Sequence, residues 1–290
     1  MKKILITGGG GLLGQHFVDK LIDEFNILAI DIAVNPFDPH QNLEYIKKDL
    51  TKFDTVKPVI DDFAPELVFN CAGTTDVDAC EQNRKQAYTL NVGLVENLLT
   101  TKAEKLIHFS SDYVFNGENG PYAEEDPTGP INYHGETKLK SETVLAESGR
   151  EHIIIRTNVL FGTGRNIRHN FITGLIDNLQ KGKKLHIVTD QFNNPIHAGN
   201  LAEAAIEAAR SDFNGILHVG GADYLSRYEI ALKTAKHFNL DQGLIRPTTT
   251  KKLNQKAKRP PKGGLKIDKA RKILKTRLLP FDEALSMIKI

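Results

Sequence analysis

The sequence has no tryptophan, two methionines and two cysteines among its 290 residues. Cys71 and Cys80 do not stand at a spacing typical of metal ligands, and Cys71 ends an apolar segment. Two such cysteines do not indicate a disulfide framework either. We therefore expect both to be buried free thiols in a reducing cytoplasm, and we expect no metal site.

Long hydrophobic runs are absent as well. The opening Met1-Lys2-Lys3 resembles the start of a signal peptide, but the apolar run after it stops at Thr7. No other run approaches the length of a membrane span. The formal net charge of +2 argues neither for nor against a nucleic-acid partner. With 40% hydrophobic and 26% charged residues, we expect a cytoplasmic globular protein, large enough for one α/β domain with an additional lobe.

A glycine-rich turn is the most informative feature that the sequence does have. Residues 4–6 read Ile-Leu-Ile, TGGGGLLG follows at 7–14, and a helical pattern begins at Leu12. This order opens a dinucleotide-binding βαβ unit: the turn must be tight, the backbone must approach a pyrophosphate, and the helix offers unpaired N–H groups. A purely structural turn is the alternative. The predicted cofactor contacts are Gly8, Gly11, Leu12, Leu13 and Gly14.

Asp31 follows the second predicted strand, at 27–30. It stands about twenty residues after the glycine turn, where an acidic side chain accepts hydrogen bonds from the adenosine ribose. The same carboxylate repels a 2′-phosphate, so it favours NAD over NADP, with NADP remaining possible. The alternative is a strand-end aspartate that caps a turn.

Further predicted strands lead to the same edge of a sheet. The strand at 43–46 leads to residues at the adenine edge, and the strand at 67–69 runs into small residues that let a cofactor approach the backbone. Residues 76–81 either face the ligand or start a helix. A helix is predicted at 84–101, a strand at 106–109 and a helix at 133–147. The predicted cofactor contacts in these segments are Asp49, Leu50, Ala72, Gly73, Thr74 and Asn91.

Strands and helices alternate regularly up to a strand at 153–155, and the alternation weakens beyond Gly162. This pattern predicts an α/β fold, a Rossmann-type doubly wound parallel sheet with a smaller C-terminal substrate lobe. We place the NAD(P)-binding domain at residues 1–160, with about 190–220 returning to it. Residues 161–290 then form mainly the substrate-binding lobe.

The segment from Arg246 to Arg277 contains thirteen Lys or Arg residues and one acid, Asp268. Such a segment can bind the phosphates of a nucleotide-linked substrate. A solvated surface and a nucleic-acid patch are the alternatives, and the small number of interleaved aromatic residues disfavours the last.

Together these segments resemble the extended short-chain dehydrogenase/reductases, and within them the dTDP-4-dehydrorhamnose reductase family. The resemblance runs nearly end to end and is carried by TGGGGLLG at 7–14, NCAGTTDVDACE at 70–81, SSDYVFNG at 110–117, GETK at 135–138 and DQFNNPIHAGNLAEA at 190–204. It implies reduction of a keto-sugar attached to a nucleotide diphosphate, with hydride taken from NADH or NADPH. A nucleotide sugar is the expected substrate, and we expect a homodimer.

The catalytic residues of that family are Ser or Thr, then Tyr and Lys in a Tyr-x-x-x-Lys pattern. The resemblance places the hydroxyl at Ser111 and the lysine at Lys138, but His134 stands where the tyrosine belongs. Tyr133 is adjacent. Residues four apart on a helix lie within about 40° of each other, whereas residues five apart differ by roughly 140°. We predict that Tyr133 faces away from Lys138 unless the helix start is distorted. Lesser departures from the family pattern are Asn158, Asn200 and Gly263.

The replacement affects proton transfer. In the family the tyrosine donates a proton to the carbonyl oxygen, while the lysine lowers its pKa and holds the nicotinamide ribose. Imidazole, with a reference pKa of about 6.5, is suited to that role, but a neighbouring lysine disfavours imidazolium. The predicted catalytic residues are Ser111, His134 and Lys138, with weakened activity. Two alternatives stay open: a non-catalytic NAD(P)-binding protein, similar to the regulatory beta subunit of methionine adenosyltransferase, and a related epimerase or dehydratase.

Overall fold

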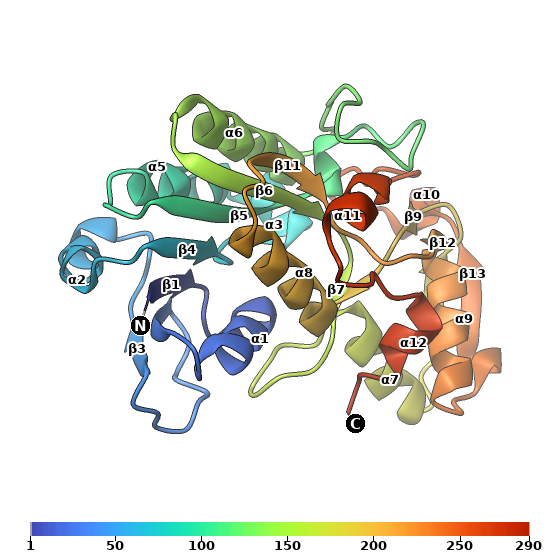
Figure 1. Ribbon diagram of the computed structural model, residues 1–290. Coiled ribbons are helices and arrows are strands. Elements are labelled where there is room, and N and C mark those ends of the chain that lie inside the picture. Colours follow the sequence, from blue (N-terminus) through green and yellow to red (C-terminus); the bar gives the residue numbers. More distant parts are fainter. Residues whose placement is uncertain (1, 290) are drawn as a thin grey trace.

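The computed structural model describes residues 2–289, which are built around one seven-stranded parallel sheet (Figure 1). Its strand order is β11-β6-β5-β4-β1-β2-β3, and every neighbouring pair is parallel. The predicted Rossmann-type doubly wound fold is therefore confirmed. The strands are β1 (Lys3–Thr7), β2 (Asn26–Asp31), β3 (Leu43–Lys47), β4 (Leu67–Asn70), β5 (Lys105–Ser111), β6 (Glu151–Thr157) and β11 (Gly215–His218).

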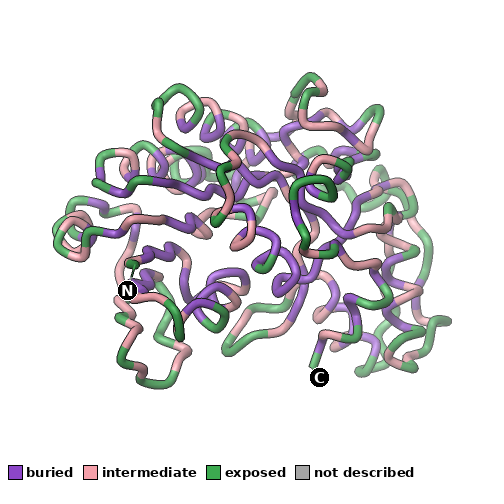
Figure 2. The backbone as a smooth tube through the Cα atoms, in the orientation of Figure 1, coloured by how far each residue is buried: buried purple, intermediate pink, exposed green. Residues whose placement is uncertain are grey.

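The side chains of β1 alternate between two apolar layers, which explains its uninterrupted Ile-Leu-Ile sequence. Ile4 and Ile6 belong to the core that includes residues of α1 (Leu12–Leu21) and α8 (Ala198–Arg210). Leu5 belongs to the core on the other face, under α2 (Lys57–Phe63), α5 (Leu94–Leu98) and α6 (Tyr133–Glu147). Figure 1 shows these helices on opposite faces of the sheet, and Figure 2 shows buried backbone through its middle.

The strand order changes direction at β1, which has β2 on one side and β4 on the other. In folds of this kind the ligand crevice lies at the carboxyl ends of the strands at that point. The hydroxyl of Thr7, which ends β1, donates to Asn70 Oδ1, at the end of β4, over 2.6 Å. The two strand ends are thus tied together where the predicted glycine turn begins.

A smaller lobe lies beside the carboxyl ends of β6 and β11 (Figure 1). Its core contains Phe161, Ile172, Ile230 and Phe281, all at most 1% exposed. The lobe elements are α7 (Phe171–Gln180), α9 (Arg227–His237), α12 (Phe281–Leu285) and the strand pairs β8 (Leu185–Val188) with β13 (Ile245–Thr248) and β9 (Phe192–Asn193) with β12 (Leu225–Ser226). The residues after β11 thus build most of the lobe, whereas the boundary near residue 160 between two domains stays a prediction.

The bounds of the helices around the predicted site agree closely with those that the sequence pattern predicts. The helix expected at 133–147 is α6, and the one expected at 84–101 is α4 (Arg84–Tyr88), a π-helical turn η2 (Thr89–Gly93) and α5. The remaining elements are η1 (Phe53–Thr55), α3 (Val77–Gln82), η3 (Asp112–Val114), β7 (Leu160–Phe161), β10 (Ile196–His197), η4 (Gln242–Leu244), α10 (Thr250–Leu253) and α11 (Asp268–Ile273).

The structure bears on the expectations for the two cysteines, for a metal site and for a membrane span. Cys71 and Cys80 are both free thiols, and Cys80 is buried while Cys71 is half-buried. Within residues 2–289 no cluster of His, Cys, Asp and Glu has the composition of a metal site. None of the helices in that range combines the length and the apolar character needed to cross a bilayer.

Candidate active site

The glycine turn packs against backbone so tightly that side chains are excluded. Gly8 has a φ of +67°, and a Cβ added there would lie 2.8 Å from the backbone nitrogen of Ala72. A Cβ on Gly14 would lie 2.2 Å from the carbonyl oxygen of Gly8. The turn therefore requires glycine at both positions, and it leans on the segment that follows β4.

The helix after this turn begins with free backbone donors. Gly11 is the N-cap of α1, no side chain caps the helix, and its first turn has no acidic residue. The N–H groups of Leu12 and Leu13 have no intrahelical acceptor at such a position, so they are donors suited to an anion. The backbone cradle and the free donors fit the pyrophosphate of a dinucleotide.

Asp31 faces the same turn from the end of β2. Its Oδ2 accepts from the backbone N–H of Gly10 at 3.0 Å, and its Oδ1 accepts from that of Ala33 at 2.9 Å. The carboxylate thus caps the turn after β2 and also lies against the glycine turn, where the ribose contact is predicted. Tyr45 lies beside it, and burial, followed by the charge of Asp31, raises the pKa of Tyr45 to about 12.

Two predicted adenine contacts have local structural partners. Asp49 Oδ1 accepts from the backbone N–H of Thr51 at 2.9 Å and from its hydroxyl at 2.7 Å, and these bonds lower the pKa of Asp49. Leu50 is 6% exposed and belongs to the core beneath α2. Both residues follow β3 on the side of the sheet where Asp31 lies, and their contact with an adenine stays a prediction.

The residues after β4 are brought together with α6 by Asn91. Its Oδ1 accepts from the backbone N–H of Thr74 at 2.9 Å, and its Nδ2 donates to the hydroxyl of Thr137 at 2.9 Å. A Cβ on Gly73 would lie 3.1 Å from Asn91 Oδ1 and 3.3 Å from Lys138 Nζ. Asn91 lies in the π-helical turn η2, a distortion that is frequent at functional sites.

A buried chain of hydrogen bonds fixes α6 against the sheet. Asn70 Nδ2 lies 3.1 Å from His108 Nδ1, and His108 Nε2 lies 2.9 Å from Ser141 Oγ. Ser141 donates its own proton to the carbonyl of Lys138 at 2.7 Å, so His108 donates from Nε2. Burial holds the pKa of His108 well below its usual range, so this ring is neutral.

Lys138 is a buried ammonium whose Nζ donates to the carbonyl of Phe109 at 2.9 Å. Burial lowers the pKa of Lys138 to about 8, against the opposing charge of Glu142. The ammonium therefore remains the dominant form at neutral pH. Its place beside Gly73 and Asn91 is suited to the ribose hydroxyls of a nicotinamide nucleotide.

Ser111 ends β5 and holds the next turn. Its hydroxyl donates to Asp112 Oδ1 at 3.2 Å and accepts from the backbone N–H of Tyr113 at 3.1 Å. Asp112 Oδ2 in turn accepts from Asn193 Nδ2 and from the backbone N–H of Gly264, each at 3.0 Å. Burial raises the pKa of Asp112. The serine is thus coupled to two segments from the far end of the chain.

His134 occupies the buried face of α6 one turn before Lys138. The chain is α-helical from Tyr133 onward, and Asn132 caps the helix by accepting from the backbone N–H of Gly135 at 2.8 Å. The ring of His134 is buried, and neither of its nitrogens has a hydrogen-bond partner. Burial, followed by the charges of Lys138 and Arg259, lowers the pKa of His134 to about 3. A neutral imidazole therefore stands where the family pattern has a phenol.

Tyr133 lies on the opposite side of the helix. Its ring lies under the guanidinium of Arg84, 4.7 Å from it, and its backbone N–H donates to Glu81 Oε1 at 2.7 Å. The helical spacing predicts this orientation, and the regular helix start leaves no distortion that would turn Tyr133 toward Lys138. Residues 76–81 start α3, with Asp76 as its N-cap.

Two side chains near His134, Tyr113 and Arg259, and a third near Tyr113, Arg227, were not predicted as site residues from the sequence. The ring centroid of Tyr113 lies 5.6 Å from that of His134, with the rings nearly perpendicular at 88°. Arg227, at the start of α9, lies near enough to Tyr113 for its charge to lower the pKa of that phenol against the effect of burial. Arg259 pairs with Asp78 at 3.0 Å. Tyr113 lies inside the segment SSDYVFNG at 110–117, but no local signal in the sequence places Arg227 near it.

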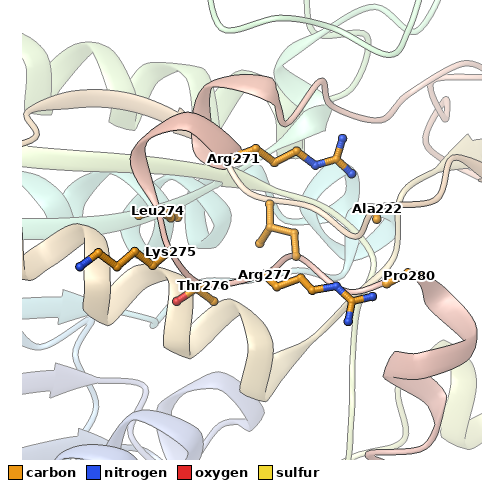
Figure 3. A pocket seen from close by; sticks show the side chains of 8 residues that line it. Ala222, Arg271, Leu274, Lys275, Thr276, Arg277 and Pro280 are labelled. Carbon is orange, nitrogen blue, oxygen red and sulfur yellow. The ribbon is translucent and has the colours of Figure 1, made fainter.

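The basic segment 246–277 is divided between different places. The charge of Arg259 helps to lower the pKa of His134. Other basic residues line a separate cavity of about 380 Å³ (Figure 3). There Arg271 and Arg277 extend to one side while Lys275 points to the other, and Arg277 pairs with Glu283 at 2.7 Å. The other lining residues are Ala222, Leu274, Thr276, Leu278 and Pro280. The segment as a whole therefore does not form one phosphate site.

The three lesser departures have structural roles. Asn158 Nδ2 donates to Asn194 Oδ1 at 2.6 Å. Asn200 joins α8 to the chain before α12, because it donates to the carbonyl of Arg277 at 2.9 Å and accepts from the N–H of Leu279 at 3.0 Å. A Cβ on Gly263 would lie 2.8 Å from Asp112 Oδ2, so glycine leaves room for that carboxylate.

Comparison with known proteins gives consistent matches along the chain. Residues 1–289 match the family described as RmlD substrate binding domain. A probable dTDP-4,6-dihydroxy-2-methyloxan-3-one 4-ketoreductase of Streptomyces antibioticus is 32% identical, with 88% of this chain and 84% of that protein covered. Methionine adenosyltransferase 2 subunit beta of Rattus norvegicus is 31% identical, covering 86% of this chain and 75% of its own. A dTDP-4-dehydrorhamnose reductase structure from Bacillus anthracis, in complex with NADP, superposes with a TM-score of 0.87 at 26% identity, covering 99% and 98% of the two chains.

Proposed function

Because the chain belongs to the RmlD substrate binding domain family, we propose that it is an NAD(P)-dependent reductase of a nucleotide-linked keto-sugar. His134 replaces the usual tyrosine in this proposal and weakens the proton-transfer step. One observation carries it: the ammonium of Lys138 lies beside Gly73 and the carbonyl of Phe109, one turn from a buried position whose ring nitrogens have no partner. Unpartnered buried nitrogens of this kind are suited to a polar ligand.

The chain's own residues provide a complete cofactor site in this proposal. The N–H groups at the start of α1 bind the pyrophosphate, Asp31 accepts from the adenosine ribose, and Lys138 holds the nicotinamide ribose. When bound, NAD(P)H supplies the hydride. The similar reductase from Bacillus anthracis was crystallised with NADP, which supports this class of cofactor, while the preference for NAD over NADP rests on Asp31.

On the substrate side, Ser111 matches the family pattern, whereas His134 replaces the tyrosine that serves as the acid. Ser111 lies at the carboxyl end of β5, where its hydroxyl can turn from Asp112 to a substrate carbonyl. At neutral pH the imidazole of His134 is neutral, because its pKa is about 3, and a neutral imidazole is a poor proton donor. General acid catalysis contributes about 10²–10⁴-fold, so reduction is expected to be slower by a factor of that size.

Incubation of the purified chain with NADH or NADPH and a 4-keto sugar nucleotide tests the proposal. We expect slow oxidation of the nicotinamide, with one sugar alcohol formed per hydride and detected by mass spectrometry. Lys138→Met serves as the inactive comparison. If dTDP, UDP and GDP keto-sugars are all left unreduced by the unaltered chain and by His134→Tyr, the chain is not a reductase of this class.

A second candidate is a non-catalytic NAD(P)-binding protein. The identity of 31% to methionine adenosyltransferase 2 subunit beta and the replacement at His134 favour it. This candidate predicts binding of NAD(P) by calorimetry with no reduction of any keto-sugar. The expected homodimer and the cytoplasmic location stay predictions as well, and sedimentation equilibrium tests the first.

A further inference from the structure

We infer that Tyr113, supported by Arg227, donates the proton to the substrate carbonyl in place of the tyrosine that position 134 lacks. The inference rests on the proposed reductase function and adds the identity of the acid. It makes Tyr113 a catalytic residue and Arg227 a positioning residue.

The other candidate donors around His134 are eliminated by their contacts. Tyr133 lies under Arg84 on the outer side of α6. The ammonium of Lys138 donates to the carbonyl of Phe109. The imidazole of His134 is held neutral by burial and by the nearby cations, which lower its pKa. Within residues 2–289, Tyr113 is the tyrosine whose ring meets that of His134, and its phenol is an acid of the family's chemical type.

Tyr113 lies in η3, directly after β5, on the side where the substrate hydroxyl contact is predicted. It lies two residues after Ser111 and donates its backbone N–H to Ser111 Oγ at 3.1 Å. Its ring meets the ring of His134 at 5.6 Å between centroids and an interplanar angle of 88°. The residue is half-buried, so a ligand can reach it. Tyr113 is therefore joined to Ser111 through its backbone and to His134 through its ring.

Arg227 provides a cation for the Tyr113 side chain. It is the first residue of α9, its guanidinium lies 4.7 Å from the ring of Phe171, and it has no carboxylate ion-pair partner within residues 2–289. The nearby carboxylate of Asp112 already accepts from Asn193 and Gly264. The contact between Arg227 and Tyr113 thus resembles the lysine–tyrosine pair of the family, with the cation supplied by the lobe.

The charged groups around Tyr113 suit an acid. Burial raises the pKa of its phenol, so the proton is present at neutral pH. Arg227 and Arg259 act in the opposite direction, whereas Asp112 and Asp78 add to the increase. Because the charge of Arg227 acts on the phenol and lowers its pKa, it favours the phenolate that forms when the proton leaves.

Reduction of the carbonyl requires one hydride and one proton. Hydride adds to the carbonyl carbon to form a C–H bond, and the C=O π pair moves to oxygen. The O–H bond of Tyr113 breaks and its proton binds that oxygen, so the substrate is reduced to the alcohol while the reduced nicotinamide is oxidised. The phenolate of Tyr113, paired with Arg227, regains a proton from water.

Three variants and one control test this assignment in the full chain. Tyr113→Phe is expected to lower kcat by about 10²-fold, with little change in the affinity for NAD(P). Arg227→Met should lower kcat less, and Arg227→Lys should recover part of that loss. Tyr133→Phe, which removes a hydroxyl from the outer side of the same helix, should match the unaltered chain. If Tyr113→Phe keeps kcat within about threefold of the unaltered chain, the inference is wrong although the reductase proposal stands. If the unaltered chain and His134→Tyr both lack turnover, the reductase proposal fails and the inference fails with it.

A second readout does not depend on turnover. The seven tyrosines are labelled with fluorotyrosine, and the ¹⁹F resonance of residue 113 is assigned by its loss in Tyr113→Phe. Arg227→Met should raise the pKa of this phenol by about one unit, because an adjacent cation favours the phenolate. An unchanged pKa would contradict the role of Arg227.

Discussion

The imidazole of His134 and the ammonium of Lys138 lie one helical turn apart on the buried face of α6, and the ammonium helps to keep the imidazole uncharged. Asn132 caps α6 by accepting from the backbone N–H of Gly135, so the helix begins at Tyr133 and includes both residues. The consequence is chemical. The chain retains the cation that supports an acid at position 134, but the ring at that position is not an effective acid at neutral pH.

Replacing this ring is therefore the most direct test of the weakened-enzyme proposal. His134→Tyr should raise kcat for a suitable keto-sugar nucleotide by about tenfold or more, because general acid catalysis contributes about 10²–10⁴-fold. The measurement is steady-state oxidation of NADH or NADPH. The gain should remain in the double variant with Tyr113→Phe, since the new phenol stands beside Lys138.

The matched control is Tyr133→Phe, which changes a neighbouring tyrosine on the outer side of α6 and should leave kcat as it is. The non-catalytic alternative forecasts that His134→Tyr leaves turnover at background. That result, obtained with NAD(P) still bound, would favour the binding protein over the reductase.

The pH dependence of the reaction should follow Lys138 and not His134. Burial lowers the pKa of Lys138 to about 8, so its charge is present below that pH and is lost as pH rises through it. The affinity for NAD(P) should therefore fall above about pH 8. His134 should add no inflection near its reference pKa, because its pKa lies at about 3. A rate that rises as pH falls through about 6.5 would instead identify imidazolium as the working acid.

The cofactor preference should depend on Asp31. We expect tighter binding of NAD than of NADP, because the carboxylate beside the glycine turn repels a 2′-phosphate. Asp31→Ala should narrow the ratio of the two dissociation constants by about tenfold. Asp31→Asn is the matched control for the charge alone, since its amide oxygen can still accept from Gly10 or Ala33. Calorimetry that finds tighter NADPH binding to the unaltered chain would refute the assignment.

The elements of the sheet and the start of α6 were predictable because their determinants are local. The apolar runs at β1 and β4, the glycines at 7–14 and the helical spacing of His134 and Lys138 all lie within a few residues of what they specify. Helix periodicity alone predicts that Tyr133 lies on the side of α6 that faces away from Lys138.

The substrate side was less predictable because it is assembled from distant segments. Arg227 starts a helix in the lobe and meets Tyr113 only through the packing of the lobe against the sheet edge. Arg259 finds its partner Asp78 in the same way. The count of basic residues between 246 and 277 suggested one phosphate site, but side-chain direction and backbone path divide these residues, as Arg259 and the cavity of Figure 3 show. Composition carries no information on that division.

Because several histidines are buried, we expect the free energy of unfolding to decrease in acid. Burial, before any other cause, lowers the pKa of His134 and His218 to about 3 and that of His197 to about 4. Because the reference pKa in the unfolded chain is about 6.5, the unfolded state binds more protons between these values, and acid favours unfolding. The contribution of these three histidines to stability should therefore be constant above about pH 7 and should fall as pH drops below about 6.5, by about 1.4 kcal/mol per pH unit for each such group.

His134→Phe isolates one of these groups, since phenylalanine fills the space and takes up no proton. The free energy of unfolding in urea, measured between about pH 5 and about pH 6.5, should fall less steeply for this variant, by about one proton per chain. The exposed His186 provides the control: His186→Gln changes a histidine that the fold does not bury and should leave the slope unchanged. Identical slopes for His134→Phe and the unaltered chain would mean that His134 accepts a proton in the folded state. The imidazolium would then be available to the substrate, and the case for Tyr113 as the donor would lose its main support.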